Sequence, residues 1–303
     1  MVETFKTWFD VLKQTVRDWV DDRSPRLGAA LAYYTVFSIA PLIVIVITIG
    51  GLWFGKQAAQ DQIFAQLASL VGEQGAKGIS GLLEAANKPH EGIVASVLAV
   101  VTLVFGATGV FVQLQDALNT IWEVKPKPGR GVWGFLRQRL LSLAMVFGIG
   151  FLLLVSLVMS AGLAAAGKWF ESSMPGGEEV WQVLNFLISF LVIAALFTLM
   201  FKYLPDVKIA WKDVWLGGVL TALLFTLGKF ALGMYLGRSS VSSAYGAAGS
   251  LVILLLWVYY SAQILFFGAE FTQVYANRFG KKLEPTPNAM WAPGQKAAQA
   301  GGA

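Results

Sequence analysis

The sequence contains no cysteine, a single histidine and few charged residues, which make up 14% of the chain. Without cysteine the chain forms no disulfide, holds no thiolate-bound metal and carries no thiol nucleophile. The one histidine, His90, lies in a polar stretch, whereas a metal site needs several converging ligands. Disulfide-stabilised folds, zinc-thiolate sites and cysteine-dependent catalysis are therefore excluded, and we expect no cofactor.

The scarcity of charge is matched by an abundance of apolar residues. Hydrophobic residues make up 56% of the 303 residues, and the mean hydropathy is +0.62. A soluble domain carries about 25% charged residues, and a surface as apolar as this one would aggregate in water. The composition therefore predicts a protein that is dissolved in lipid. The first apolar run is too long for a signal-peptide core, so no cleavable signal is expected.

Six stretches are long and apolar enough to cross a bilayer, which takes about 20 residues in a helix. Backbone groups in lipid must bond within their own segment, so each stretch is expected to be helical, and the alternation typical of barrels is missing. The predicted fold class is all-α, a polytopic transmembrane helical bundle. Its six membrane-spanning helices are expected at about 27–55, 92–115, 140–167, 180–201, 214–236 and 244–270.

Lysine and arginine are distributed unevenly between the two sides of this predicted bundle. Seventeen fall in the N-terminal lead, the loops after the second and fourth spans, and the tail, whereas five fall in the opposite loops. Because positive charge concentrates on the cytoplasmic side of a membrane, both termini are predicted in the cytoplasm. An even number of spans agrees with this orientation.

Three segments surround the predicted membrane domain, residues 27–271. Residues 1–26 have the spacing of an amphipathic helix, which would lie either on the inner leaflet or against the protein's own cytoplasmic face. The outer loop, residues 56–91, is expected to form two short helices, separated by a run of glycines at 72, 75 and 78. The tail, residues 272–303, is rich in Pro, Ala, Gln and Gly and is predicted to be disordered.

Ionisable groups at membrane depth are costly, so they are candidates for a functional role. Lys229 lies roughly 6 Å outside the midplane at about 1.5 Å per residue. It either anchors a substrate or extends its long stem to the outer surface, and both interpretations stay open. Glu270 closes the last span on the inner side, too far away for a pair with Lys229. Its expected partners are a backbone amide or the cations Lys202, Arg137 and Arg139.

Other polar side chains gather at the ends and bends of the predicted spans. The end of the second span could line a polar vestibule or form an ordinary polar helix end. In the first span a proline at position 41 favours a kink, and two tyrosines precede it. The small residues before the last span favour close packing or a partly unwound segment. The candidate substrate or cavity residues are Lys229, Tyr33, Tyr34, Gln113, Asp116, Asn119, Tyr245 and Glu270.

The chain resembles the YihY/BrkB family of bacterial inner-membrane proteins, formerly labelled ribonuclease BN-like. The likeness covers roughly residues 10–280 and implies a six-helix fold and multi-pass residence in the inner membrane. Each motif is short, and their order across the spans makes the likeness specific. The motifs are Ala29–Pro41 (AALAYYTVFSIAP), Leu118–Pro126 (LNTIWEVKP), Tyr203–Pro205 (YLP), Tyr245–Gly249 (YGAAG) and Gly268–Glu270 (GAE).

Two functional classes remain after ribonuclease activity is set aside. Metal-dependent cleavage of RNA needs clustered His, Asp or Glu ligands, which the sequence lacks. The protein is therefore expected not to be an enzyme and not to bind nucleic acid. Its expected partners are membrane lipids, and its predicted function is the transport or translocation of a lipid or other amphiphile. The alternative is a structural scaffold of the envelope without transport, and the sequence leaves a homo-oligomer open.

Overall fold

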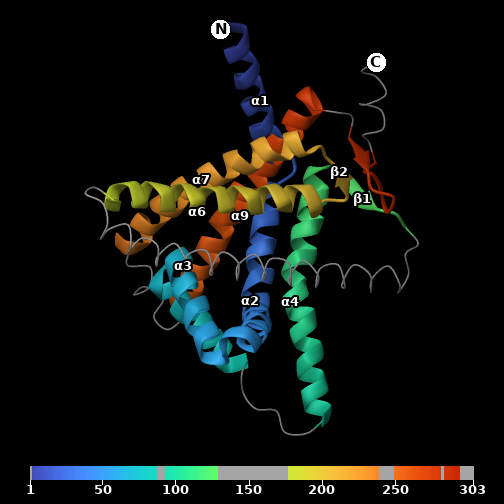
Figure 1. The fold of residues 1–303 in the computed structure, drawn as a ribbon. Helices are drawn as coiled ribbons and strands as arrows, with labels where there is room; N and C mark the ends of the chain where they lie inside the picture. Colours follow the sequence, from blue (N-terminus) through green and yellow to red (C-terminus); the bar gives the residue numbers. More distant parts are fainter. Residues whose placement is uncertain (1, 87–92, 129–176, 239–248, 281–282, 294–303) are drawn as a thin grey trace.

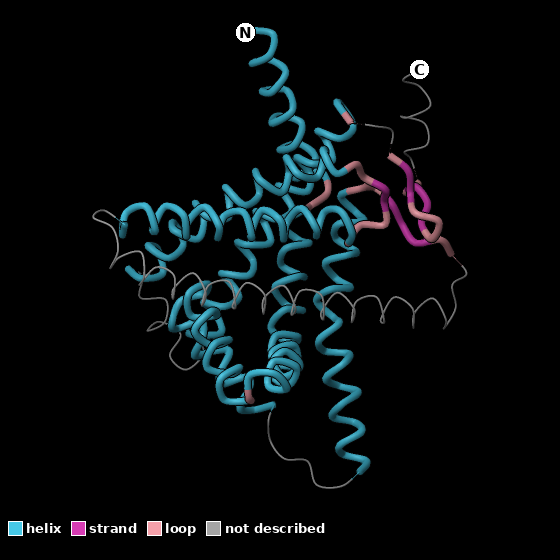
Figure 2. Tube along the Cα trace, viewed as in Figure 1, coloured by secondary structure: helices cyan, strands magenta, loops and turns pink. Residues whose placement is uncertain are grey.

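The computed structural model describes residues 2–86, 93–128, 177–238, 249–280 and 283–293, and most of them are helical (Figures 1 and 2). In Figure 1 helices α6 and α7 run side by side and cross the direction of α2 and α4 at a steep angle. The helices are α1 (Val2–Asp21), α2 (Ser24–Phe54), α3 (Lys56–Ala86), α4 (Ile93–Ile121), α6 (Gly177–Tyr203), α7 (Trp211–Arg238) and α9 (Gly249–Phe279).

Four helices of the described part are long and apolar enough to cross a membrane. Their apolar segments are Ser24–Leu52, Phe186–Tyr203, Trp211–Leu232 and Leu251–Phe279. They match the first, fourth, fifth and sixth predicted spans, and α4 occupies the position of the second. The third predicted span, 140–167, lies outside the described residues. The helical membrane class is thus confirmed, whereas six spans and cytoplasmic termini stay predictions.

The segment predicted as two short outer helices is one helix, α3, of 31 residues. It follows α2 directly after Gly55, whose φ of 82° lies in the left-handed region that glycine adopts at little cost. Each glycine inside α3 costs about 1 kcal/mol of helix propensity. Packing outweighs that cost, because Ile79 and Leu83 are buried against Ile47 of α2 and Leu254 of α9.

The predicted disordered tail also needs correction. Helix α9 continues to Phe279, and two short strands follow it. Strand β3 (Glu284–Pro285) pairs antiparallel with β2 (Val207–Lys208), and β4 (Ala289–Trp291) pairs antiparallel with β1 (Val124–Pro126). Leu283 and Ala289 are buried. Burial of these apolar residues and pairing with β1 and β2 place residues 283–293, which composition alone does not reveal.

Helix α1 ends at Asp21 rather than near residue 26, and it lies against the end of α9. Val11 is completely buried in a cluster with Phe271 and Val274. The Trp8 ring stacks on Phe271 with 6.5 Å between ring centroids. One face of α1 therefore packs on the protein itself. Contact of its other face with a membrane leaflet stays a prediction.

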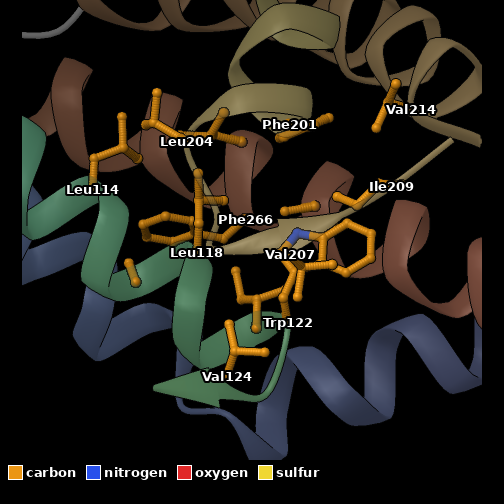
Figure 3. Close-up of a cluster of buried hydrophobic side chains, with 14 of the residues drawn as sticks. Leu114, Leu118, Trp122, Val124, Phe201, Leu204, Val207, Ile209, Val214 and Phe266 are labelled. Carbon is orange, nitrogen blue, oxygen red and sulfur yellow. The ribbon is translucent and has the colours of Figure 1, made fainter. Parts of the chain in front are cut away.

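The largest core lies where the end of α4, the α6–α7 connection, the start of α2 and the middle of α9 meet. Figure 3 shows labelled side chains of α4, of the α6–α7 region and of α9 converging. Trp122 is 1% exposed, and Phe201 and Phe266 are completely buried. Trp19 and Leu27, on either side of the turn from α1 to α2, pack against this core and so position the site described next.

Candidate functional site

The structure distributes the predicted cavity residues over several separate surfaces. Tyr33 and Tyr34 are exposed on α2, with their rings in edge-to-face contact at 5.8 Å. Gln113 is half-buried on α4, and Asp116 is exposed one turn further along. Tyr245 lies outside the described residues.

Asn119 has a structural partner. Its amide donates to the Asp206 carboxylate at 3.1 Å, and its carbonyl oxygen accepts from the Asp206 backbone N–H at 2.8 Å. The pair ties the end of α4 to the turn after α6. This reciprocal bonding leaves Asn119 little capacity for a ligand.

Lys229 is exposed on α7. Four neighbours on α7, namely Leu224, Leu227, Gly228 and Ala231, lie on one side of the helix because their spacing is i, i+3, i+4 and i+7. Successive residues are rotated by roughly 100° in a helix of 3.6 residues per turn, so Lys229 projects from the opposite side. It does not share a site with the other candidates that the structure describes.

Glu270 is the buried charge among the candidates. It is 1% exposed on α9, directly after the core residue Ala269, and neither carboxylate oxygen has a hydrogen-bond partner among the described residues. One predicted partner, Lys202, is engaged elsewhere: its amine donates to the Ile209 carbonyl and lies over the Trp211 ring. The predicted partners Arg137 and Arg139 lie outside the described residues.

The charged groups that act on Glu270 in the described part are carboxylates. They are Asp22, in the turn after α1, Asp18, in the last turn of α1, and Glu123, in the turn after α4. Ser24, the first residue of α2, lies beside Glu270, but no hydrogen bond of normal geometry joins them. We call these five residues the acidic cluster.

Two features of the acidic cluster indicate strain and titration near neutral pH. Arg23 and Glu123 adopt left-handed backbone with φ of 54° and 56°, which costs energy in residues other than glycine. The pKa of Asp22 is raised to about 7, first because burial disfavours the carboxylate and then because Glu123, Asp18 and Asp21 repel it. The turns thus hold carboxylates together against their mutual repulsion.

A groove of about 510 Å³ lies beside the cluster, between α1, α7 and α9. Its lining is almost entirely apolar. On α7 the groove is lined by the side of the helix opposite Lys229. Helix α9 contributes Tyr260 and Phe267, and α1 contributes Val16 and Trp19. Ligand sites usually measure roughly 300–1,000 Å³, so the apolar groove, as we name it, is large enough for an acyl chain.

Two polar groups on this lining lack partners within the described structure. Both amide atoms of Gln263 and the indole nitrogen of Trp19 are buried without a hydrogen bond. The Gln263 amide lies against Gly28 of α2, where a Cβ atom would overlap it. The sequence interpretation missed Gln263, although a glutamine inside an apolar span is a signal that could have identified it.

Residues that could hold a metal do not converge. In the described ranges no three His, Cys, Asp or Glu side chains lie close enough together to share an ion. The acidic carboxylates are therefore near enough to repel one another but are not arranged as a metal site.

The fold and these sites define a polytopic helical protein embedded in a membrane. The family described as Virulence factor BrkB matches residues 15–292, and the chain belongs to this family. A UPF0761 membrane protein of Methylibium petroleiphilum is 30% identical over 297 residues, which cover 95% of this chain and 68% of the relative. No solved structure matches the chain.

Two further relatives have the same name. A UPF0761 membrane protein of Pseudomonas aeruginosa is 28% identical over 276 residues, 89% of this chain and 63% of the relative. One from Rhodospirillum centenum is 28% identical over 288 residues, 92% of this chain and 61% of the relative. The chain thus spans roughly two thirds of the length of these relatives, and their names state membrane residence but no activity.

Proposed function

We propose that this protein binds a lipid or other amphiphile in the apolar groove and moves it within the membrane, without catalysing a chemical reaction. The observation that carries the proposal is the groove itself, which is apolar and open to the surroundings. An acyl chain fits this apolar lining.

The free face of α1 supports a lipid as the ligand. Phe9, Leu12, Val16 and Val20 are exposed and lie along one side of the helix at i, i+3, i+7 and i+11. Exposed basic residues at positions 6, 13 and 17 follow on the neighbouring side. An apolar stripe beside basic groups suits an anionic lipid surface. Because Val16 belongs to both this stripe and the groove, the stripe leads into the groove.

The membrane setting of this function is part of the same proposal. We place the protein in the bacterial inner membrane with six spans and both termini in the cytoplasm, on the basis of the uneven distribution of Lys and Arg. Reporter fusions after residues 86 and 203 test the orientation. An alkaline phosphatase fusion should be active after residue 86 and inactive after residue 203, and the reverse pattern would contradict the proposed topology.

Reconstitution in proteoliposomes tests the function. Wild-type protein should accelerate the movement of a fluorescent anionic phospholipid between leaflets. Ala231 is exposed and lines the groove, so Ala231→Trp should fill it and slow the movement by roughly tenfold, the equivalent of about 1.4 kcal/mol. Ala58→Trp, at an exposed alanine on α3, is the matched control and should leave the rate unchanged.

The outcomes of this assay separate the two functional classes. If wild-type protein moves no lipid or soluble amphiphile, the transport proposal fails and a scaffold of the envelope becomes the better account. If lipid moves equally fast in Ala231→Trp, the groove is not the path. Chromatographic elution and melting temperature of both variants confirm that they are folded.

A further inference from the structure

Glu270 presents a physical problem that amphiphile binding does not solve. An ionised carboxylate buried without a hydrogen bond or a counter-charge is very unfavourable, and such a group normally takes up a proton or acquires a partner. In the described structure Glu270 has neither kind of partner, and its charged neighbours are all carboxylates. Among the described residues nothing balances the charge of an ionised Glu270, so this side chain needs a proton or another positive ligand.

The segments packed around this part of α9 supply carboxylates and hydroxyls rather than a counter-charge, as far as the structure describes them. Helix α7 offers Thr221 and Gly217, and the threonine hydroxyl already donates to the Gly217 carbonyl at 2.6 Å. Helix α1 and the turn after it contribute Asp18 and Asp22, and the turn after α4 contributes Glu123. Within the described ranges no ion pair joins Glu270 to a lysine or arginine.

Ser24, beside Glu270, is a second buried polar group that indicates a ligand. Its side chain is completely buried beside the carboxylate, and its hydroxyl has no hydrogen-bond partner in the described part of the chain. A neutral carboxylic acid has an O–H that donates and a carbonyl oxygen that accepts, so protonated Glu270 could bond such a hydroxyl. The absence of a third close ligand disfavours a metal ion here.

We propose that Glu270 binds a proton at neutral pH and that Asp22 transfers this proton between Glu270 and the solvent. Asp22 is suited to this role because it is half-buried in the turn after α1 and lies two residues before Ser24, which is beside Glu270. Glu270 is thus the binding residue and Asp22 the route. The proposal is independent of amphiphile movement, because its ligand is the proton.

Infrared spectroscopy of the full chain in nanodiscs tests the bound proton directly. Wild-type protein at about pH 8, where an ordinary glutamate is ionised, should show the C=O stretch of a neutral carboxylic acid. Incorporation of carboxyl-¹³C glutamate should shift the band, which assigns it to a glutamate, and Glu270→Gln should remove it. Glu284→Gln, at an exposed glutamate, is the control and should keep the band.

Glutamine imitates a protonated glutamate, so Glu270→Gln should melt within error of wild type at this pH. If wild-type protein shows no neutral glutamate band, Glu270 is ionised and the proposal is overturned. Replacing choline with sodium at constant pH identifies a competing ligand. A band that disappears with sodium would assign the site to that cation and contradict the proton.

Exchange of the carboxyl proton for deuterium tests the route. Asp22→Asn should slow the isotope shift of the Glu270 band by roughly tenfold or more, because the transferring group is lost. Asp21→Asn changes an exposed aspartate beside it and should have no effect. Equal exchange rates in wild type and Asp22→Asn would show that Asp22 does not transfer the proton. The presence or absence of the neutral carboxyl band tests the bound proton separately.

Discussion

The acidic cluster and the apolar groove lie side by side on α9 and differ in almost every physical property. The cluster is rich in carboxyl groups, with Glu270 and Ser24 buried and the other carboxyl groups half-buried, whereas the groove is open and apolar. Gln263 and Glu270 are seven residues apart, so they lie on the same face of α9, about two turns from each other. They meet Gly28 and Ser24 on α2. A single helix–helix contact thus supports two sites with different chemistry.

This contrast fits the two ligands proposed above. A buried carboxyl group with little access to water suits a proton, while an open apolar groove suits a flexible chain. Trp19 belongs to the groove, and its neighbour Asp18 belongs to the cluster. Helix α1 therefore covers both sites, although only one of its faces packs on the protein.

The largest expected effect on stability comes from substituting glycines where α7 and α9 approach each other closely. Two such glycines compare the packing of the helix contact at Gly217 with the packing of the groove at Gly228. A Cβ at Gly217 would overlap Thr272, whose branched side chain cannot yield, so Gly217→Val should cost about 3 kcal/mol. A Cβ at Gly228, in the groove, meets the ends of Tyr260 and Ile264, so Gly228→Val should cost about 1 kcal/mol. Denaturant unfolding in detergent measures both.

A second substitution checks the cause of this difference. Thr272→Ala opens space opposite position 217, so Gly217→Ala combined with Thr272→Ala should be more stable than Gly217→Ala alone. Equal losses in the two valine variants, or no recovery in the double variant, would show that the groove is packed as tightly as the α7–α9 contact at Gly217.

Asp22→Asn addresses the charge of the cluster and should have an intermediate effect. The pKa of Asp22 is about 7 in the folded protein and about 3.9 when unfolded, so its ionisation destabilises the fold as pH rises from about 4 to 7. Asp22→Asn should be more stable than wild type at about pH 8, by roughly 1–2 kcal/mol after solvent screening. The gap should close near pH 4, whereas a constant gap would exclude titration as its cause.

The smallest expected effect is that of Lys229→Met. Because Lys229 is exposed on the side of α7 opposite the groove, the change should alter stability by less than about 0.5 kcal/mol. Lipid movement in proteoliposomes should also match wild type and Lys229→Arg. A loss of movement in Lys229→Met that Lys229→Arg restores would move the substrate site away from the groove.

Sequence reasoning predicted the helical membrane class and the positions of the described apolar helices, because long runs without charge have few other solutions. It missed the continuity of α3, since burial of Ile79 and Leu83 outweighs several glycines. It also missed the strands after α9, which depend on pairing with distant loops.

For the site, sequence reasoning ranked an exposed and a buried charge together. Lys229 and Glu270 both interrupt apolar helices, and only the packing of α1, α2 and α4 around α9 distinguishes them. The uncharged polar residue Gln263 was missed, because a search for charges inside apolar spans finds only ionisable groups. The groove depends on how three helices meet, which periodicity along one helix does not reveal.

Saturable capture of lipid at the groove tests the central claim most directly. The chain has no cysteine, so a single cysteine at position 231 or 58 can carry a photoreactive thiol label without background. In native membranes the label at 231 should capture lipid, and capture should fall as a single-chain amphiphile is added, whereas capture at 58 should not. Equal response at both positions, or no capture at 231, would contradict an amphiphile site in the groove.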